Sequence, residues 1–170
     1  MDSSPQRYVS QQKALTFGFQ PILDLLVNDR LGDLVKTHWA EIGADRAAVP
    51  LAVNWGAVLQ REAAGTLRAF TARRDGALVG YIGFNFFCPD RHTGTLYIRD
   101  ETIWVVTTEA HRGLVWRAMW QAAVPMLPRP CKLMAGLTMG RDKRHTRVLA
   151  KVLKRLGLRP MEMVMGAYLE

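Results

Sequence analysis

Between residues 66 and 107, hydrophobic and polar positions alternate with the period of two that is typical of β-strands. Asp75–Gly76 interrupts the alternation, and this pair favours a two-residue hairpin turn because both positions accept a positive φ. The sequence therefore predicts a hairpin over residues 66–89. After the loop DRHTG, the run TLYIRDETIWVVT at 95–107 predicts the next strand.

Hydrophobic residues at helical spacing precede this strand-rich centre. Residues 21–43 carry apolar side chains three and four positions apart and end at Gly43, a suitable helix stop. Residues 54–65 form another candidate helix, with Asn54 as its N-cap and Gly65 as its terminator. We therefore expect the chain to begin with helical structure before the hairpin.

The second half of the chain continues to alternate between element types. EAHRGLVWRAMW at 109–120 predicts a helix, CKLMAGLTM at 131–139 a strand, residues 143–156 a basic helix, and EMVMGAYLE at 162–170 a final strand. With a weakly indicated strand near residues 14–16, the order is (β)ααβββαβαβ. This order predicts an α/β protein with a mixed sheet and helices on both faces.

Length and composition favour one globular domain. We expect a single domain over residues 1–170, with residues 1–12 as a flexible N-terminal arm. The hydrophobic fraction of 49% is ordinary, and no apolar run approaches the roughly 20 residues that a membrane helix needs. The first residues lack the basic-then-apolar order of a secretory signal. We therefore expect a cytoplasmic protein without membrane association.

The net charge of +8 favours a negatively charged partner but does not specify which one. Residues 141–159 hold eight Lys or Arg against one Asp. Such a surface attracts nucleic acid or a phosphorylated cofactor, and a solvated helix face in a basic protein explains the same residues. Cys88 and Cys131 have no Cys or His at metal-ligand spacing, so we expect reduced thiols and no metal site.

Arg112 and Gly113 stand at the junction between the strand at 95–107 and the helix that follows. The first N–H groups of a helix are free and its dipole favours negative charge, so this junction is suited to a pyrophosphate. A glycine permits close approach of the backbone, and an arginine adds charge-assisted hydrogen bonds. The junction is therefore the candidate anion site.

Four segments together resemble the GNAT superfamily of acyl-CoA N-acyltransferases, and most of all the small GNAT-like proteins of bacteriophages and prophages. They are HWAEIG…VPLAVNW at 38–55, GTLRAFTARRDGALVGYIGF at 65–84, TIWVVTTEAHRG at 102–113 and VLKRLGLRPMEMVMGAYLE at 152–170. The resemblance rests on their order and spacing, which extend over nearly the entire chain.

This resemblance implies a GNAT-like twisted sheet of about six or seven strands, in which the fourth and fifth strands part to admit the pantetheine arm of acetyl-CoA. It implies that main-chain groups of Trp104, Val105 and Val106 pair with that arm. It also implies that the next turn holds the pyrophosphate through Arg112, Gly113, Leu114, Val115, Trp116 and Arg117. The reaction that it implies requires no metal.

The chain departs from the family pattern at two places. Val115 and Arg117 occupy positions where the family has small residues, and a Val forced to positive φ would cost about 1–3 kcal/mol. Trp116 adds bulk beside the expected phosphates, although Trp116 and Trp120 also have the spacing of one core helix face. Weaker cofactor binding is therefore predicted. In addition, Leu153 stands where the family usually has its general-acid tyrosine.

Transfer to an amine requires a group that removes a proton from the nucleophile. Alternation sends Asp100 and Glu101 to opposite faces of their strand, and Glu101 is the candidate base because GNAT enzymes often place a carboxylate there. His145, near the start of the basic helix, is the candidate acid for the leaving thiolate. Both residues could equally be exposed groups without a chemical role, and His38 and His92 have no partner that the sequence indicates.

Two functions remain open. The first is an N-acyltransferase that moves an acetyl or other short acyl group from acyl-CoA to an unknown primary amine. The second is a catalytically inactive, phage-encoded protein on a GNAT scaffold, which binds nucleic acid or a protein partner through residues 141–159 as an inhibitor or particle component. The location would be the host cytoplasm or, for a particle component, the virion. An exposed final strand would allow a homodimer.

Overall fold

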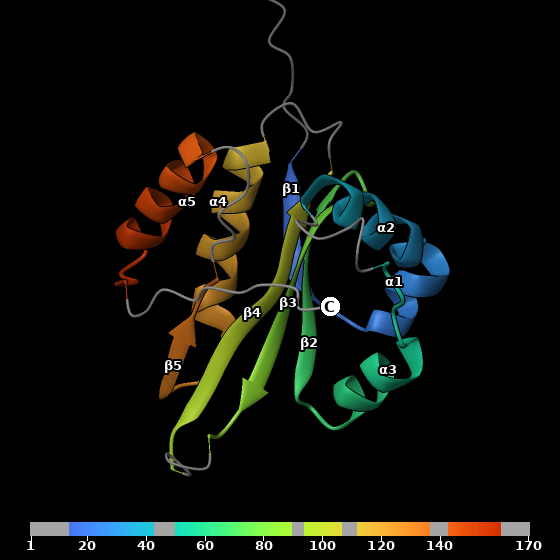
Figure 1. Cartoon of the computed structure of the whole chain (residues 1–170), viewed down its shortest axis with the longest axis horizontal. Helices are drawn as coiled ribbons and strands as arrows, with labels where there is room; N and C mark the ends of the chain where they lie inside the picture. Colours follow the sequence, from blue (N-terminus) through green and yellow to red (C-terminus); the bar gives the residue numbers. More distant parts are fainter. Residues whose placement is uncertain (1–13, 43–49, 90–93, 107–111, 137–142, 161–170) are drawn as a thin grey trace, which may run out of the picture.

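The computed structural model describes residues 14–42, 50–89, 94–106, 112–136 and 143–160. Five strands form one mixed sheet in the order β1-β2-β3-β4-β5, in which only the β4–β5 pair is parallel. Helices α1, α2 and α3 cover one face, and α4 and α5 lie on the other (Figure 1). The predicted α/β class is confirmed.

Strands β2, β3 and β4 lie where the alternating pattern places them, β1 is longer than expected, and β5 ends at Met134 rather than at residue 139. The described residues form five strands, fewer than the six or seven that the resemblance implied. Their bounds are β1 Leu15–Gln20, β2 Leu67–Arg74, β3 Ala77–Phe87, β4 Leu96–Val105 and β5 Cys131–Met134. The turn between β2 and β3 has φ values of 52° at Asp75 and 82° at Gly76, so the predicted hairpin is confirmed. The predicted final strand at 162–170 and the predicted arm at 1–12 lie outside the described residues.

The helices agree with the sequence except at one point. Their bounds are α1 Ile22–Asn28, α2 Leu31–Ile42, α3 Trp55–Ala63, α4 Arg112–Ala123 and α5 Lys143–Arg155, with a 3-10 turn at Val124–Met126. The continuous helical pattern of residues 21–43 is two helices, because Arg30 adopts a φ of 53° between them. In α3, Asn54 Oδ1 accepts a hydrogen bond from Ala57 N at 3.0 Å, which confirms the predicted cap.

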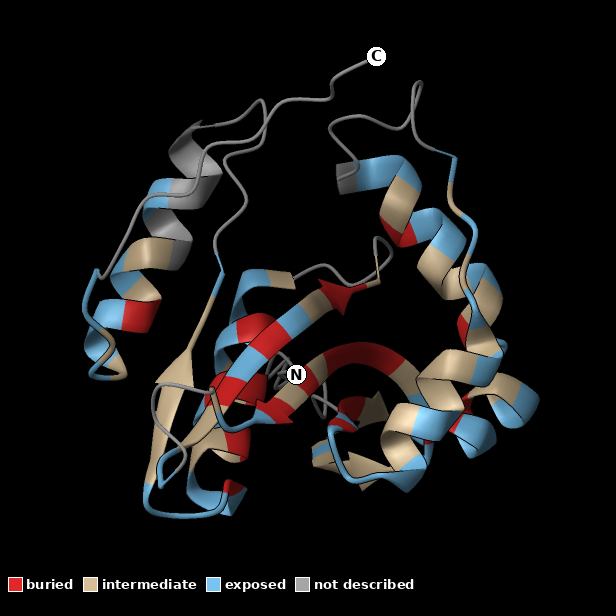
Figure 2. Cartoon of the chain, turned by 60° about the horizontal axis from the view of Figure 1, so that its bottom comes forward, coloured by how far each residue is buried: buried red, intermediate tan, exposed pale blue. Residues whose placement is uncertain are grey.

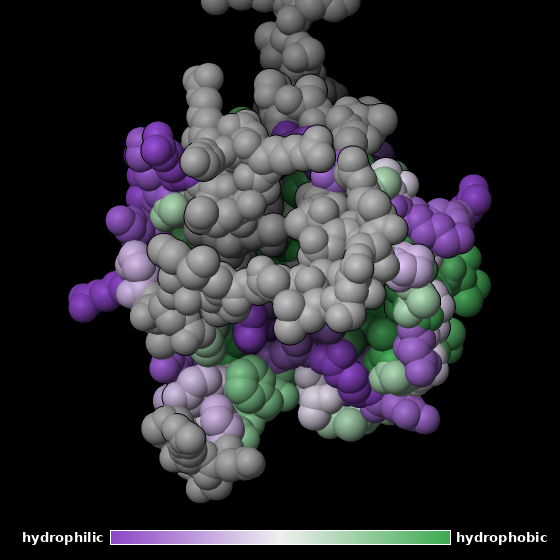
Figure 3. Space-filling view, in the orientation of Figure 1, coloured by the Kyte–Doolittle hydropathy of each residue, from purple (hydrophilic) through white to green (hydrophobic). Residues whose placement is uncertain are grey.

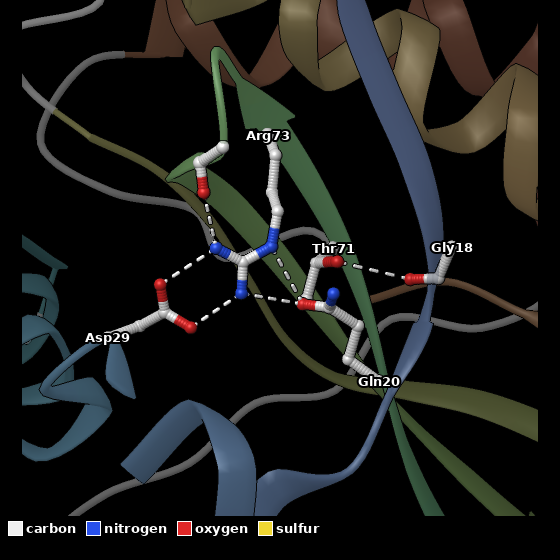
Figure 4. Close-up of polar contacts among 6 residues, drawn as sticks. Gly18, Gln20, Asp29, Thr71 and Arg73 are labelled. Atoms are coloured by element: carbon white, nitrogen blue, oxygen red, sulfur yellow. Dashed lines mark hydrogen bonds and ion pairs between the residues drawn. The ribbon is translucent and has the colours of Figure 1, made fainter. Parts of the chain in front are cut away.

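A half-buried arginine, Arg73, ties the break between α1 and α2 to the sheet (Figure 4). Arg73, near the end of β2, binds both oxygens of Asp29, with Nη1–Oδ1 and Nη2–Oδ2 distances of 2.8 and 2.5 Å. The same guanidinium donates to Gln20 Oε1 and to Gly76 O. Because Asp29 is the C-cap residue of α1, this contact joins the end of α1 to β2.

The core has two parts, one on each face of the sheet, and buried residues concentrate along the strands and the inner side of α4 (Figure 2). Trp116 and Trp120 belong to the part beneath α4, so their core spacing is confirmed. Trp104 and Tyr81 belong to the part beneath α1, α2 and α3. The two faces of the sheet are therefore chemically distinct, and the second carries the polar groups described below.

Helix α5 follows the predicted basic segment. Arg147 and Lys151 are exposed, whereas Leu153 is 6% exposed and packs with the core beneath α4. Hydrophilic surface gathers over α5 at the left of Figure 3, and apolar surface lies at the right over the N-terminal helices. In the described part of the chain, no helix is long and apolar enough to cross a membrane.

Candidate active site

Strands β4 and β5 pair over only part of their length. The parallel ladder runs from Leu96↔Cys131 to Arg99↔Met134 and then stops, while β4 continues to Val105 (Figure 1). At the point of separation, Asp100 Oδ1 accepts a hydrogen bond from Gly136 N at 2.6 Å. We call this place, where the described pairing ends between residues 100–105 of β4 and residues 135–136 after β5, the split.

Main-chain groups of β4 face the split at alternate residues. Val106 N donates to Val79 O at 2.9 Å, so the main chain of Val106 is turned toward β3. Because antiparallel strands alternate, the main-chain groups of Val105 and Ile103 point to the other edge. Of the three residues expected to pair with a pantetheine arm, Val105 therefore offers its backbone to the split, whereas Trp104 and Val106 face the neighbouring strand.

The predicted pyrophosphate turn is the first part of α4. Val115 is helical and 1% exposed, so the conditional strain of a positive φ does not arise there. Trp116 is likewise buried in the core, whereas Gly113, Leu114 and Arg117 are exposed. Val115 and Trp116 thus pack into the core, whereas Arg117, the other departure from the family pattern, is exposed. Residues 107–111, which lead into the helix, lie outside the described part of the chain.

Arg112 has a partner that the sequence did not indicate. Its Nη2 lies 2.9 Å from Glu41 Oε2, and the same oxygen accepts a hydrogen bond from Trp104 Nε1 at 3.1 Å. Glu41 lies in the last turn of α2, so this contact joins α2, β4 and the start of α4. The side chain of the predicted phosphate ligand is thereby ion-paired to α2.

Glu101 faces the α3 side of the sheet. Arg61 binds its two carboxylate oxygens, with Nη1–Oε1 and Nη2–Oε2 distances of 3.2 and 3.0 Å, and Arg61 Nη2 also contacts Asn85 Oδ1. Because Gly83 pairs with Thr102 and Phe84 pairs with Asp100, Glu101 is the extra residue of a β-bulge. The bulge explains why Glu101 and Thr102, which are adjacent in sequence, both line the cavity described next.

A cavity of about 390 Å³ lies between the sheet and the helices α1, α2 and α3. Apolar side chains form most of its wall, and Glu101, Thr102, His38 and Tyr81 contribute the polar groups. Its β4 side begins two residues after the last β4–β5 pair at Arg99. The cavity and the split therefore border the same stretch of β4. The cavity lies on the side of α1, α2 and α3, and the split lies on the side of β5.

His38 is the polar residue that the sequence reasoning missed. It is 5% exposed, and its Nδ1 lies 3.0 Å from Tyr81 Oη and 3.3 Å from Thr102 Oγ1. Its ring stacks on Trp104, with centroids 5.9 Å apart. Burial lowers the pKa of His38 to about 4, since desolvation outweighs the attraction of Glu41, so the imidazole is neutral at pH 7. The sequence offered one signal for this residue, namely a histidine on the apolar face of the predicted helix.

Two other acid–base groups have shifted pKa values. Burial raises the pKa of Asp100 to about 6, although the hydrogen bond from Gly136 N opposes the shift. Burial also raises the pKa of Tyr81 well above its usual range, so its hydroxyl stays protonated. The side chain of the predicted acid His145 lies outside the described residues, and the roles of Glu101 and His145 stay predictions.

No family model matches the chain, and no curated protein matches its sequence. Solved structures do match its fold. A ribosomal-protein-alanine N-acetyltransferase from Brucella melitensis biovar Abortus 2308 is 16% identical, with 92% of this chain and 99% of that chain covered and a TM-score of 0.62. An aminoglycoside acetyltransferase, HMB0005, from an uncultured soil metagenomic sample is 11% identical, with the same coverage and a TM-score of 0.64.

A third solved structure with this fold is described as a protein of a different function. A transcriptional regulator from Bacillus halodurans C-125 is 16% identical, covers 92% of this chain over 100% of its own length, and has a TM-score of 0.62. At these identities the likeness concerns the fold alone, and fold does not specify activity. The chain thus has the GNAT-like fold of solved acetyltransferases, with the β4–β5 split that its sequence led us to expect.

Proposed function

We propose that the protein is an N-acyltransferase that moves an acetyl or other short acyl group from acyl-CoA to a primary amine. One observation carries the proposal: among the described residues, pairing of β4 with β5 ends at Arg99, and the main-chain groups of Ile103 and Val105 point away from β3, toward the split. A slender amide-containing arm can pair with such an edge as an added strand would. A cavity on the opposite side of β4 offers the second substrate a place.

The residues around the split fit an acyl-CoA. The first N–H groups of α4 are free of intrahelical partners and suit a phosphate, and Arg112 lies at that end of the helix. Val115 and Trp116 are packed inward, so their bulk does not occupy the approach to those groups. Bound acyl-CoA would supply a thioester, whose carbonyl carbon is the electrophile.

In the transfer, the amine nitrogen forms a bond to the acyl carbon and the carbon–sulfur bond breaks. CoA leaves as a thiolate, which takes up one proton, and the amine loses one proton to a base. We assign the base role to Glu101, acting through water, because it lies on β4 at the meeting point of cavity and split. Arg61 orients its carboxylate by binding both oxygens.

Calorimetric titration with acetyl-CoA tests the proposal directly. We expect a dissociation constant in the range of roughly 1 μM to 1 mM that is common for enzyme substrates. Arg112→Glu should weaken binding about tenfold or more, because it replaces a charge-assisted donor by a repelling carboxylate. Lys36→Glu is the matched control, since it makes the same charge change on the exposed side of α2.

The titration can also refute the proposal. If the wild-type chain gives neither heat nor a thermal shift with millimolar acetyl-CoA, the transferase function is wrong. Equal losses in the Arg112 and Lys36 variants would indicate general electrostatics rather than a site at the start of α4. The second function, an inactive scaffold that binds nucleic acid, would then require affinity for DNA that falls steeply with salt.

A further inference from the structure

The wall of the cavity beneath α1, α2 and α3 is apolar over most of its area and polar at one end. Most of its wall consists of aliphatic and aromatic side chains from these helices and from β2, among them Leu25, Val35, Val58 and Ala69. Its volume of about 390 Å³ is within the range of small-molecule sites. A ligand that fills it must therefore present an apolar surface to most of the wall.

The polar groups of this cavity lie together at its β4 side. Glu101 and Thr102 are adjacent on β4, and Thr102 Oγ1 lies 3.3 Å from His38 Nδ1, which in turn lies 3.0 Å from Tyr81 Oη. This polar end is also the end nearest the split, because pairing of β4 with β5 stops at Arg99. A ligand head group placed there would lie next to the incoming acyl group.

One atom at this end has no hydrogen-bond partner among the described residues. His38 Nε2 is buried and unpaired, on a side chain that lines the cavity and is 5% exposed. The ring is neutral at pH 7, so Nε2 accepts a hydrogen bond when Nδ1 donates to Tyr81 Oη. Buried polar atoms are nearly always paired, so in this tautomer His38 Nε2 has capacity for one further hydrogen bond from an N–H donor.

We propose that the cavity binds the acceptor, and that the acceptor is a primary amine on an aromatic or branched aliphatic body. This inference rests on the proposed function and deepens it by naming the substrate class. The apolar body lies among the side chains of α1, α2 and α3, and the amine reaches Glu101 and His38. Hydroxylated or multiply charged amines are excluded, because the apolar wall cannot pair their polar groups.

The test uses the full chain and two kinds of probe. 2-Phenylethylamine and 3-methylbutylamine represent the proposed class, and spermidine and kanamycin represent polar amines. Binding is followed by calorimetry and by the fluorescence of Trp39 and Trp55, which line the cavity. Transfer from acetyl-CoA is followed by release of the CoA thiol. We expect kcat/KM to be about tenfold or more higher for the apolar amines.

Filling the cavity provides the second arm of the test. Val58→Trp places an indole in the cavity from α3 and should lower affinity for 2-phenylethylamine about tenfold or more without changing affinity for acetyl-CoA. Val35→Trp makes the same change from α2, in case one variant fails to fold. Leu23→Trp is the matched control, because Leu23 lies on α1 at 54% exposure and does not line the cavity.

The outcomes separate this inference from the function on which it rests. If acetyl-CoA binds but the polar amines are the better substrates, or if no apolar amine binds, the acceptor class is wrong and the transferase function stands. If acetyl-CoA does not bind, the function is wrong, and amine binding that Val58→Trp abolishes still supports the cavity as an amine site. Equal losses in the Val58 and Leu23 variants would overturn the cavity assignment.

Discussion

Asp100 makes the stability of this protein depend on pH in a predictable direction. The residue is 8% exposed at the point where β4 and β5 part, and burial raises its pKa from 3.8 to about 6. In the unfolded chain the carboxyl ionises near pH 3.8, whereas in the folded chain it keeps its proton until about pH 6. Folding is therefore favoured by this residue at low pH, and the contribution is lost as the pH rises through 6.

The magnitude follows from the two pKa values. A difference of about two units corresponds to about 3 kcal/mol in total, at about 1.4 kcal/mol per unit. Between pH 4.5 and pH 8, about 2 kcal/mol of this should be lost. Asp100→Asn removes the ionisation and keeps an oxygen that can accept the hydrogen bond from Gly136 N.

We expect the free energy of unfolding of Asp100→Asn, relative to the wild-type chain, to rise by about 2 kcal/mol from pH 4.5 to pH 8. Urea unfolding followed by circular dichroism at both pH values measures this difference. The contribution of His38 is common to both chains and cancels in the comparison. A difference that stays constant with pH, or that falls as the pH rises, would refute the reasoning about burial.

Three further predictions concern His38, Arg73 and Glu101. The wild-type chain should lose about 2 kcal/mol of its free energy of unfolding as the pH falls from 7 to 5, because the buried imidazole of His38 resists protonation down to about pH 4. His38→Gln should not show this loss, and equal pH profiles of the two chains in urea would contradict the reasoning. Arg73→Met should lower thermal stability by about 2 kcal/mol by leaving Asp29 without its cation, and an unchanged midpoint would show that the ion pair is dispensable. Glu101→Gln should reduce kcat about 100-fold in the thiol-release assay with unchanged affinity for acetyl-CoA, while Asp33→Asn serves as a surface control; full activity would remove Glu101 as the base.

The outline of the fold was predictable because its signals are local. The Asp75–Gly76 turn, the Asn54 cap and the alternation in β2, β3 and β4 each depend on a few neighbouring residues. The break between α1 and α2 was not predictable in this way. It depends on Arg30 and on the contact between Asp29 and Arg73, which are 44 positions apart.

The candidate site was predictable only in part. The resemblance implied that β4 borders the split, and the end of β4–β5 pairing at Arg99 agrees with this, while the role of Arg112 stays a prediction. The sequence did not indicate which backbone groups face the split, because that depends on the register of β4 against β3. It also did not indicate that Val115, expected in the phosphate-binding turn, packs into the core, because that depends on the position of α4 on the sheet.

By itself, the sequence determined the element order, the hairpin, the helix cap and the basic character of α5, since propensity, periodicity and charge belong to short segments. Only the tertiary structure decided the partners of the polar groups. Glu41 meets Arg112 across 71 positions, and His38 meets Tyr81 across 43. Both pairs depend on how α2 lies on the sheet, and the position of Glu101 depends on the bulge in β4. A local sequence pattern specifies neither of these, because each is set by contacts between segments that are far apart in the chain.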